Sequence, residues 1–263
     1  MPARFPFKLF FLVLAALLAA TSAGVWAADD KAEPEPPGDD TVTPALDPAK
    51  VADNVILRVL DARNRTQSSN NLKQIGLALH NYASANSSTL PGDVLDKAGK
   101  PLLSWRVLLL PYLEQQNLYL KFKLDEPWDS KNNRPLVEIL PKVFASPRVK
   151  VKGKGYTVYQ IFSGPGALFD KGKTKYNIGN IPDGTSNTIF TVEASKAVPW
   201  SKPADIPFNK DKKLPDFGKA YGNKPLALMM DGSVRTLDLK KIKPETIKLA
   251  IIPDDGMPLG LDW

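Results

Sequence analysis

The stretch from residue 70 to 82 constrains the fold more than any other part of this chain, because it is patterned as an amphipathic helix. Its large apolar residues recur at spacings of three and four, which places them on one face of an α-helix: Leu72, Ile75, Leu79 and Tyr82. The polar residues between them point away from that face. A helix of this kind must lie on another element, and we expect it to be the element on which the rest of the chain packs.

The same periodicity begins earlier in the chain. Apolar residues from Val51 onward also share one side of a helix, namely Val55, Ile56, Val59 and Leu60. Asp47 or the turn at Pro48 would begin the helix. We therefore expect one long helix from about residue 48 to 86, although two collinear helices would also fit the pattern.

Short helices and turns follow this helix. Ser104 is a candidate N-cap for a helix over 105–110, which Pro111 breaks or restarts. A further short helix is expected over 132–139, and a closing helix over 244–251. The chain has 24 prolines and 17 glycines, so we expect long loops between these elements.

Strand patterns begin after Gly155. Branched and aromatic residues predict strands over 156–163 and 188–194, and a hairpin of 226–230 with 233–237 around Asp231-Gly232. The predicted fold class is therefore α+β, with a long N-terminal helix packed on an antiparallel sheet. We expect the tail over 253–263 to be irregular, with Leu261 and Trp263 docked on the body.

The first 27 residues have the three parts of a secretory signal. Arg4 and Lys8 precede an apolar run over 9–20, and Ala27 and Ala28 flank the expected cleavage position. We therefore expect an extracytoplasmic protein, periplasmic or secreted. An uncleaved N-terminal membrane anchor is the alternative, and only that case would place the protein on a membrane.

Charge divides the rest of the chain. Residues 28–47 contain seven acidic residues, one lysine and several prolines, a composition that predicts a disordered acidic tether. The globular domain predicted over 48–263 has 32 basic and 21 acidic residues. A basic surface attracts acidic polymers, but the lysines are dispersed along the sequence, which also fits a plain solvated surface. We expect no nucleic-acid partner.

Candidate chemistry is sparse. The chain has no cysteine and a single histidine, His80, so neither a zinc site nor a Ser-His-acid site is expected, and no cofactor is predicted. Asp183 and Asn187 flank a glycine turn and are weak calcium candidates, since calcium prefers oxygen ligands. The alternative is that both side chains satisfy backbone groups of that turn.

Four phrases, over 69–82, 104–115, 181–189 and 231–235, together resemble a bacterial family known as domain of unknown function 1559. The residues that carry the resemblance are Asn70, Asn71, Leu72, Lys73, Gln74, Trp105, Pro111, Asp183, Gly184, Asn187, Asp231 and Gly232. The resemblance covers about residues 65–240. It implies a pilin-like fold and an extracytoplasmic role, and it brings no catalytic residue.

The chain departs from that family's pattern in three ways. It has an ordinary signal and an acidic segment where family members carry a prepilin cleavage site, and Tyr221 stands where many have histidine. Ser68 and Ser146 stand near two positions where relatives often have cysteine. If those cysteines pair in the relatives, the Cα atoms of Ser68 and Ser146 should lie within about 7 Å of each other.

The sequence thus predicts an exported, non-enzymatic structural or interaction protein of the cell envelope. Its partner would be another envelope protein or an acidic polysaccharide. A module that binds acidic polysaccharide is the second hypothesis, and a hydrolase with acids converging on His80 is the third.

Overall fold

The computed structural model describes residues 48–263, with side chains from Val55 onward. The predicted signal peptide, its cleavage position and the acidic tether lie outside the described residues. Over 48–263 the fold is α+β, as predicted. In this part of the chain, no helix is long and apolar enough to cross a bilayer.

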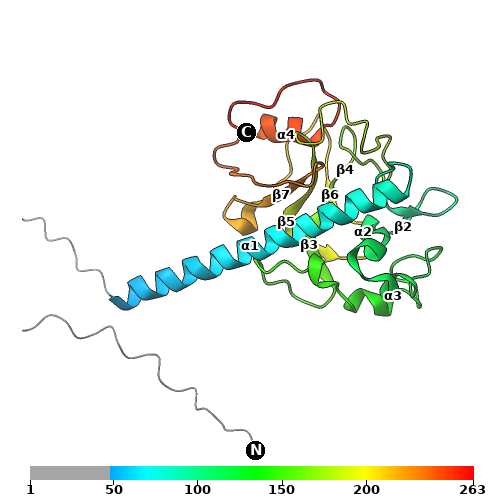
Figure 1. Ribbon diagram of the computed structural model, residues 1–263, viewed down its shortest axis with the longest axis horizontal. Coiled ribbons are helices and arrows are strands. Elements are labelled where there is room, and N and C mark those ends of the chain that lie inside the picture. The colour runs from blue at the N-terminus through cyan, green and yellow to red at the C-terminus, as the bar shows by residue number, and fades with distance from the viewer. Residues whose placement is uncertain (1–47) are drawn as a thin grey trace, which may run out of the picture. The chain divides into compact units, whose positions relative to one another are not determined.

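Helix α1, Pro48–Ala85, is continuous, as expected, and lies across the sheet with its N-terminal part extending beyond it (Figure 1). The rest of the described domain, residues 86–263, is called the head below. The C-terminal half of α1 packs on the head through Leu72, Ile75 and Leu79, which all have 0% exposure. The predicted apolar face is therefore the buried face.

The main sheet has four antiparallel strands in the order β3-β5-β7-β8. The strands are β3 (Tyr156–Gln160), β5 (Ile189–Pro199), β7 (Leu226–Met229) and β8 (Val234–Thr236). β7 and β8 form the predicted hairpin around Asp231-Gly232. There are two further sheets of two strands each. In one, β1 (Val94–Leu95) pairs with β2 (Pro101–Leu103), and in the other, β4 (Phe162–Ser163) pairs with β6 (Ile206–Pro207).

The strand predicted over 156–163 is interrupted at Ile161. The Ile161 amide donates to an Asp205 carboxylate oxygen at 3.0 Å, and its carbonyl accepts from the Ile206 amide at 3.0 Å. Because these partners lie outside the main sheet, the chain leaves β5 at this point. It continues as β4, parallel to β6.

Two hydrophobic cores lie on opposite faces of the sheet. Successive residues of β7 alternate between them: Leu226 and Leu228 join the core under α1, while Ala227 and Met229 join the core under helix α4, Pro244–Ile251. α4 has the predicted bounds. The first core also contains Trp105 and Trp200, both fully buried.

The remaining helices are short. They are α2 (Trp105–Leu108), α3 (Gln116–Tyr119) and four 3₁₀ turns, η1 (Leu110–Leu113), η2 (Arg134–Glu138), η3 (Lys142–Phe144) and η4 (Lys219–Tyr221). The Ser104 hydroxyl accepts from the Arg106 amide, as expected for an N-cap. The helix expected over 105–110 ends at Leu108, and the chain continues as η1 from Leu110, with Pro111 in its first turn.

Gly76 allows α1 to lie close to the β7–β8 hairpin. A Cβ at this position would lie 3.0 Å from Leu228 Cδ1 and 3.3 Å from Gly232 Cα. A larger residue would push the helix away from the turn. Two of the family phrases therefore meet at this contact.

The tail prediction is half right. Trp263 packs against the second core and lies beneath the Arg235 guanidinium, 5.5 Å from the ring centroid. Leu261 is instead fully exposed. The tail is held through Asp262, which accepts from the Lys243 amide at 2.6 Å and the Thr246 hydroxyl at 2.9 Å, so Leu261 has no packing role.

Candidate functional site

A buried polar cluster lies where α1 crosses the sheet. Ser68 on α1 donates to Glu193 on β5 at 2.6 Å, and its hydroxyl lies 2.7 Å from the hydroxyl of Tyr159 on β3. All three residues have 0% exposure. Glu193 also accepts from the Leu226 amide at 2.8 Å. The cluster therefore joins the helix to β3, β5 and β7.

Arg148, in the loop before β3, also belongs to this cluster. Its guanidinium forms an ion pair with Glu193 and lies over the Tyr221 ring, 4.9 Å from the centroid. Burial raises the pKa of Glu193, and the hydrogen bonds from Ser68 and Arg148 oppose this. Because both oxygens of the carboxylate accept from donors of the chain itself, Glu193 is engaged within the fold and the cluster stabilises it.

Ser68 and Ser146, which stand near the two cysteine positions of relatives, both lie near Tyr159. Ser68 hydrogen-bonds to the Tyr159 hydroxyl, and the Ser68 and Ser146 hydroxyls lower the pKa of Tyr159 against the larger effect of burial. Asn71 donates to the Ala145 carbonyl at 3.0 Å, which holds the segment around Ser146 against α1. This arrangement supports the predicted proximity of the two serines, whose Cα separation stays a prediction.

A second buried ion pair lies beside β1. Arg106, with 0% exposure, pairs with Asp205 at 2.6 Å and also donates to the Tyr159 carbonyl, at 2.7 Å from Nη2. Asp93 accepts from the Trp105 amide at 3.1 Å. Burial, reinforced by the Asp205 carboxylate, raises the pKa of Asp93 to about 7. In the sequence, the one sign of this cluster is an arginine within an apolar segment.

The side chains of the two calcium candidates, Asp183 and Asn187, form hydrogen bonds with backbone groups of the chain itself. The Asp183 carboxylate accepts from the amides of Asp255 and Gly256, at 2.8 and 2.9 Å. The Asn187 side chain donates to the Asp183 carbonyl at 3.0 Å. These contacts match the alternative in which both side chains satisfy the backbone. Over residues 55–263, no group of three or more His, Cys, Asp or Glu residues could hold a metal ion.

His80 lies at the β7–β8 turn. Its Nε2 atom is buried without a hydrogen-bond partner, and a Cβ on Gly232 would lie 3.8 Å from it. The nearby Asp231 carboxylate accepts from the Ser233 amide at 2.8 Å, as in an Asp-Gly turn. Neither residue is arranged as a general acid or base toward the other.

The remaining family-motif residues are divided between core and surface. Leu72 and Trp105 are fully buried, and Pro111 lies in the first turn of η1. Exposed positions are Asn70, Lys73 and Gln74 on α1. The phrase around Gly184 contacts the hairpin, since the Thr185 carbonyl accepts from the Asp231 amide at 3.1 Å. Most of the phrases therefore mark contacts that hold the fold.

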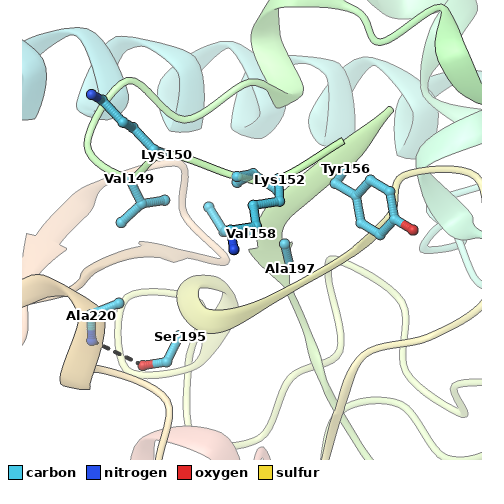
Figure 2. A pocket seen from close by; sticks show the side chains of 9 residues that line it. Val149, Lys150, Lys152, Tyr156, Val158, Ser195, Ala197 and Ala220 are labelled. Atoms are coloured by element: carbon cyan, nitrogen blue, oxygen red, sulfur yellow. Dashed lines mark hydrogen bonds between the residues drawn. The ribbon is translucent and has the colours of Figure 1, made fainter. Parts of the chain in front are cut away.

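An open groove of about 450 Å³ lies beside β3, outside these clusters (Figure 2). It is lined by the loop before β3, the first half of β3, the outer part of β5 and η4. The lining residues are Val149, Lys150, Val151, Lys152, Tyr156, Val158, Ser195, Ala197 and Ala220. No acidic residue is among them.

A second pocket, of about 630 Å³, lies between the loop over 166–176 and the tail. Lys175 pairs with Asp254 at 2.9 Å, and the Tyr176 hydroxyl donates to the same carboxylate. Its wall mixes both signs of charge, since Asp170, Asp254 and Asp255 line it together with Lys173, Lys175 and Lys210. The groove beside β3 is the stronger candidate for a ligand.

Sequence reasoning missed this groove, although a signal was present. The segment from Val149 to Tyr156 alternates lysines with valines and glycines and ends in an aromatic residue. Taken one by one, these lysines looked dispersed. Their alignment along one wall depends on how the loop folds over β3 and β5.

The fold and its internally satisfied clusters define an α+β domain in which a helix lies on an antiparallel sheet. Residues 61–160 match the family model described as protein of unknown function (DUF1559), which confirms the predicted family for this part of the chain. No curated protein and no solved structure matches the sequence.

Proposed function

We propose that this protein is an exported, non-enzymatic interaction module of the cell envelope with a pilin-like design. The N-terminal part of α1, residues 55–60, carries the proposal and is called the arm below. Its large apolar side chains are exposed: Val55 51%, Ile56 57%, Leu57 63%, Val59 61% and Leu60 45%. A contiguous apolar surface of this kind is typical of a docking site for another protein.

The polar residues of the head support the same proposal. Glu193, Asp205 and Asp183 all bind groups of the chain itself, through an arginine, a second arginine and two backbone amides respectively. Side chains used in this way stabilise a scaffold. The geometry therefore favours a protein that presents surfaces rather than one that performs a reaction.

Two measurements test the proposal. N-terminal sequencing of the protein from fractionated cells should find it outside the cytoplasm and beginning at Ala28. A photo-crosslinking amino acid at Leu57 should then form a discrete adduct with an envelope protein in intact cells, whereas the same amino acid at exposed Lys97 should not. Cytoplasmic location, or equal crosslinking at both positions, would contradict the proposal.

The second hypothesis, binding of an acidic polysaccharide, is favoured by a separate observation, the lysine-lined groove. It does not depend on the arm, and we develop it in the next subsection.

A further inference from the structure

We infer that the groove beside β3 is a binding site for an acidic saccharide chain, held by lysine ammonium groups and stacked on Tyr156. Nothing in the family match assigns a ligand to this surface. The argument depends on the shape of the groove, its charge and its one exposed aromatic ring.

The groove exists because β5 bulges away from β3. Thr157 pairs with Val198 and Tyr159 pairs with Glu193, so a step of two residues on β3 faces a step of five on β5. Residues 194–197 thus face the single residue Val158, and the carbonyl of Lys196 accepts from the Gln160 side chain. The bulge is therefore fixed by a hydrogen bond, and it forms one wall of the groove.

The bulge of β5 is also hydrogen-bonded to the segment around η4. The Ser195 hydroxyl donates to the Phe217 carbonyl at 2.8 Å and accepts from the Ala220 amide at 3.2 Å, the contact drawn in Figure 2. These bonds fix η4 against the bulge. The groove is thus bounded by fixed backbone on the side of β5 and η4.

The opposite wall carries the charge. Lys150 and Lys152 line the groove; in Figure 2 the Lys152 ammonium lies among the lining side chains, and that of Lys150 points away from them. Three more exposed lysines adjoin lining residues or belong to the same loop: Lys154, Lys196 and Lys219. None of these five takes part in the ion pairs found among residues 55–263. Their positive charge is therefore available to a ligand.

The carboxylate nearest to the groove along β5 does not cancel this charge. Glu193 is fully buried on the helix side of the sheet and is paired with Arg148. With no acidic residue in the lining, the local field is positive. Such a surface attracts carboxylate or sulfate groups and releases them as salt screens the interaction.

Tyr156 gives the site its chemical selectivity. It is 37% exposed at one end of the groove, with its hydroxyl pointing outward, while the Lys152 side chain extends toward the middle (Figure 2). Gly153 contacts the ring edge, where a Cβ would lie 3.3 Å from Cε2, and so leaves room for the ring to lie flat. A flat aromatic face beside small apolar walls suits the apolar face of a sugar ring.

The size and composition of the groove favour a saccharide over other acidic polymers. A volume of about 450 Å³ lies in the range of sites that hold a few small rings. Single-stranded nucleic acid is usually held by several aromatic side chains that stack successive bases, and this lining has one. A lipid surface would require several exposed large apolar residues, and Tyr156 is the only one in this lining.

The test uses the full chain and polygalacturonate, with its methyl ester as the uncharged counterpart. Wild-type protein should bind polygalacturonate, should not bind the ester, and should lose affinity as NaCl rises from about 50 to about 300 mM. The K150Q/K152Q variant should bind at least about tenfold more weakly, and Y156A several-fold more weakly. Both variants alter exposed side chains, so we expect their thermal unfolding midpoints to equal that of the wild type. This measurement shows that a loss of binding does not come from misfolding.

The matched control is K97Q/K100Q, which removes two exposed lysines from the turn between β1 and β2 and should change the affinity less than about twofold. Equal losses in the two double variants would overturn the site, because binding would then follow net charge alone. Absence of binding to polygalacturonate, or binding of its methyl ester equally well, would overturn the ligand class. So would tighter binding of duplex DNA or anionic phosphatidylglycerol vesicles through the same lysines.

Discussion

The two halves of helix α1 have similar sequence patterns and opposite surroundings. In the C-terminal half, Leu72, Ile75 and Leu79 are fully buried against the sheet. In the arm, Ile56 and Val59 are more than half exposed. Apolar periodicity thus indicates a helix in both places, but it does not say whether the partner of the apolar face is the same chain.

The difference between the halves begins at Ser68. From this residue onward the helix makes hydrogen bonds into the head, to Glu193, Tyr159 and the Ala145 carbonyl. Before it, the contact with the head is limited to the end of the sheet, where Arg65 donates to Thr236 on β8. The buried half is fixed by the sheet, whereas the arm depends on helix propensity and on any partner that covers it.

The largest effect should come from removing a core leucine of the buried half. Leu79→Ala should lower the free energy of unfolding by about 2–5 kcal/mol, because it leaves a cavity between α1 and the sheet. Leu57→Ala in the arm should change it by less than about 0.5 kcal/mol. Urea unfolding followed by tryptophan fluorescence measures both, and similar losses would show that the arm packs on the head.

A disulfide between helix and loop should stabilise the fold by about 2–4 kcal/mol, since it closes a long loop. The S68C/S146C variant should form this bond on mild oxidation, because Asn71 donates to the Ala145 carbonyl and so holds the segment beside Ser146 against α1. The comparison is between the oxidised and reduced forms of the same protein, by chemical unfolding. In the matched control, S69C/S146C, the cysteine lies about 100° further round the helix and should not pair. Equal disulfide formation in both would refute the proximity.

Ser68→Ala should cost about 1–3 kcal/mol, because Glu193 and Tyr159 each lose a buried hydrogen-bond partner. Thr66→Ala is the control in the exposed half, where the hydroxyl donates only to the Ala62 carbonyl of the same helix. It should be close to neutral. A neutral effect of Ser68→Ala would show that the buried cluster does not anchor the helix.

The smallest effect should be a pH dependence of the free energy of unfolding, caused by Asp93. Asp93 has a pKa of about 7 in the folded protein against an ordinary value of 3.8, so the folded state binds more protons between these values. Stability should therefore fall as pH rises from about 4 to about 7. Because Asp93 is partly exposed, solvent limits the effect. Asp93→Asn should flatten the profile, measured by urea unfolding at several pH values, and an unchanged profile would assign it to other groups.

Much of the fold was predictable because its signals are local. Turn residues such as Asp231-Gly232, the cap at Ser104 and the bounds of α4 depend on neighbours a few residues away, and these predictions are confirmed. Trp263 docks as expected, whereas Leu261 does not. The path of the tail was harder to predict, because it is decided by hydrogen bonds that the Asp262 carboxylate accepts from Lys243 and Thr246.

The candidate site was less predictable. Asp183 satisfies the amides of Asp255 and Gly256, which lie more than seventy residues later in the chain, so no local pattern could reveal its role. The groove likewise joins the segment 149–156 to the bulge 194–197 and to η4. Its charge was visible in the sequence, but its shape was not.

The sequence by itself determined that this chain contains an amphipathic helix, an antiparallel hairpin and phrases of the family that residues 61–160 match. Period, turn chemistry and composition are properties of neighbouring residues. Tertiary structure alone decided which half of α1 is buried, which carboxylates face arginines and where the lysines line a groove. Each of these depends on pairing between distant segments, and the register of β3 on β5 sets the last of them.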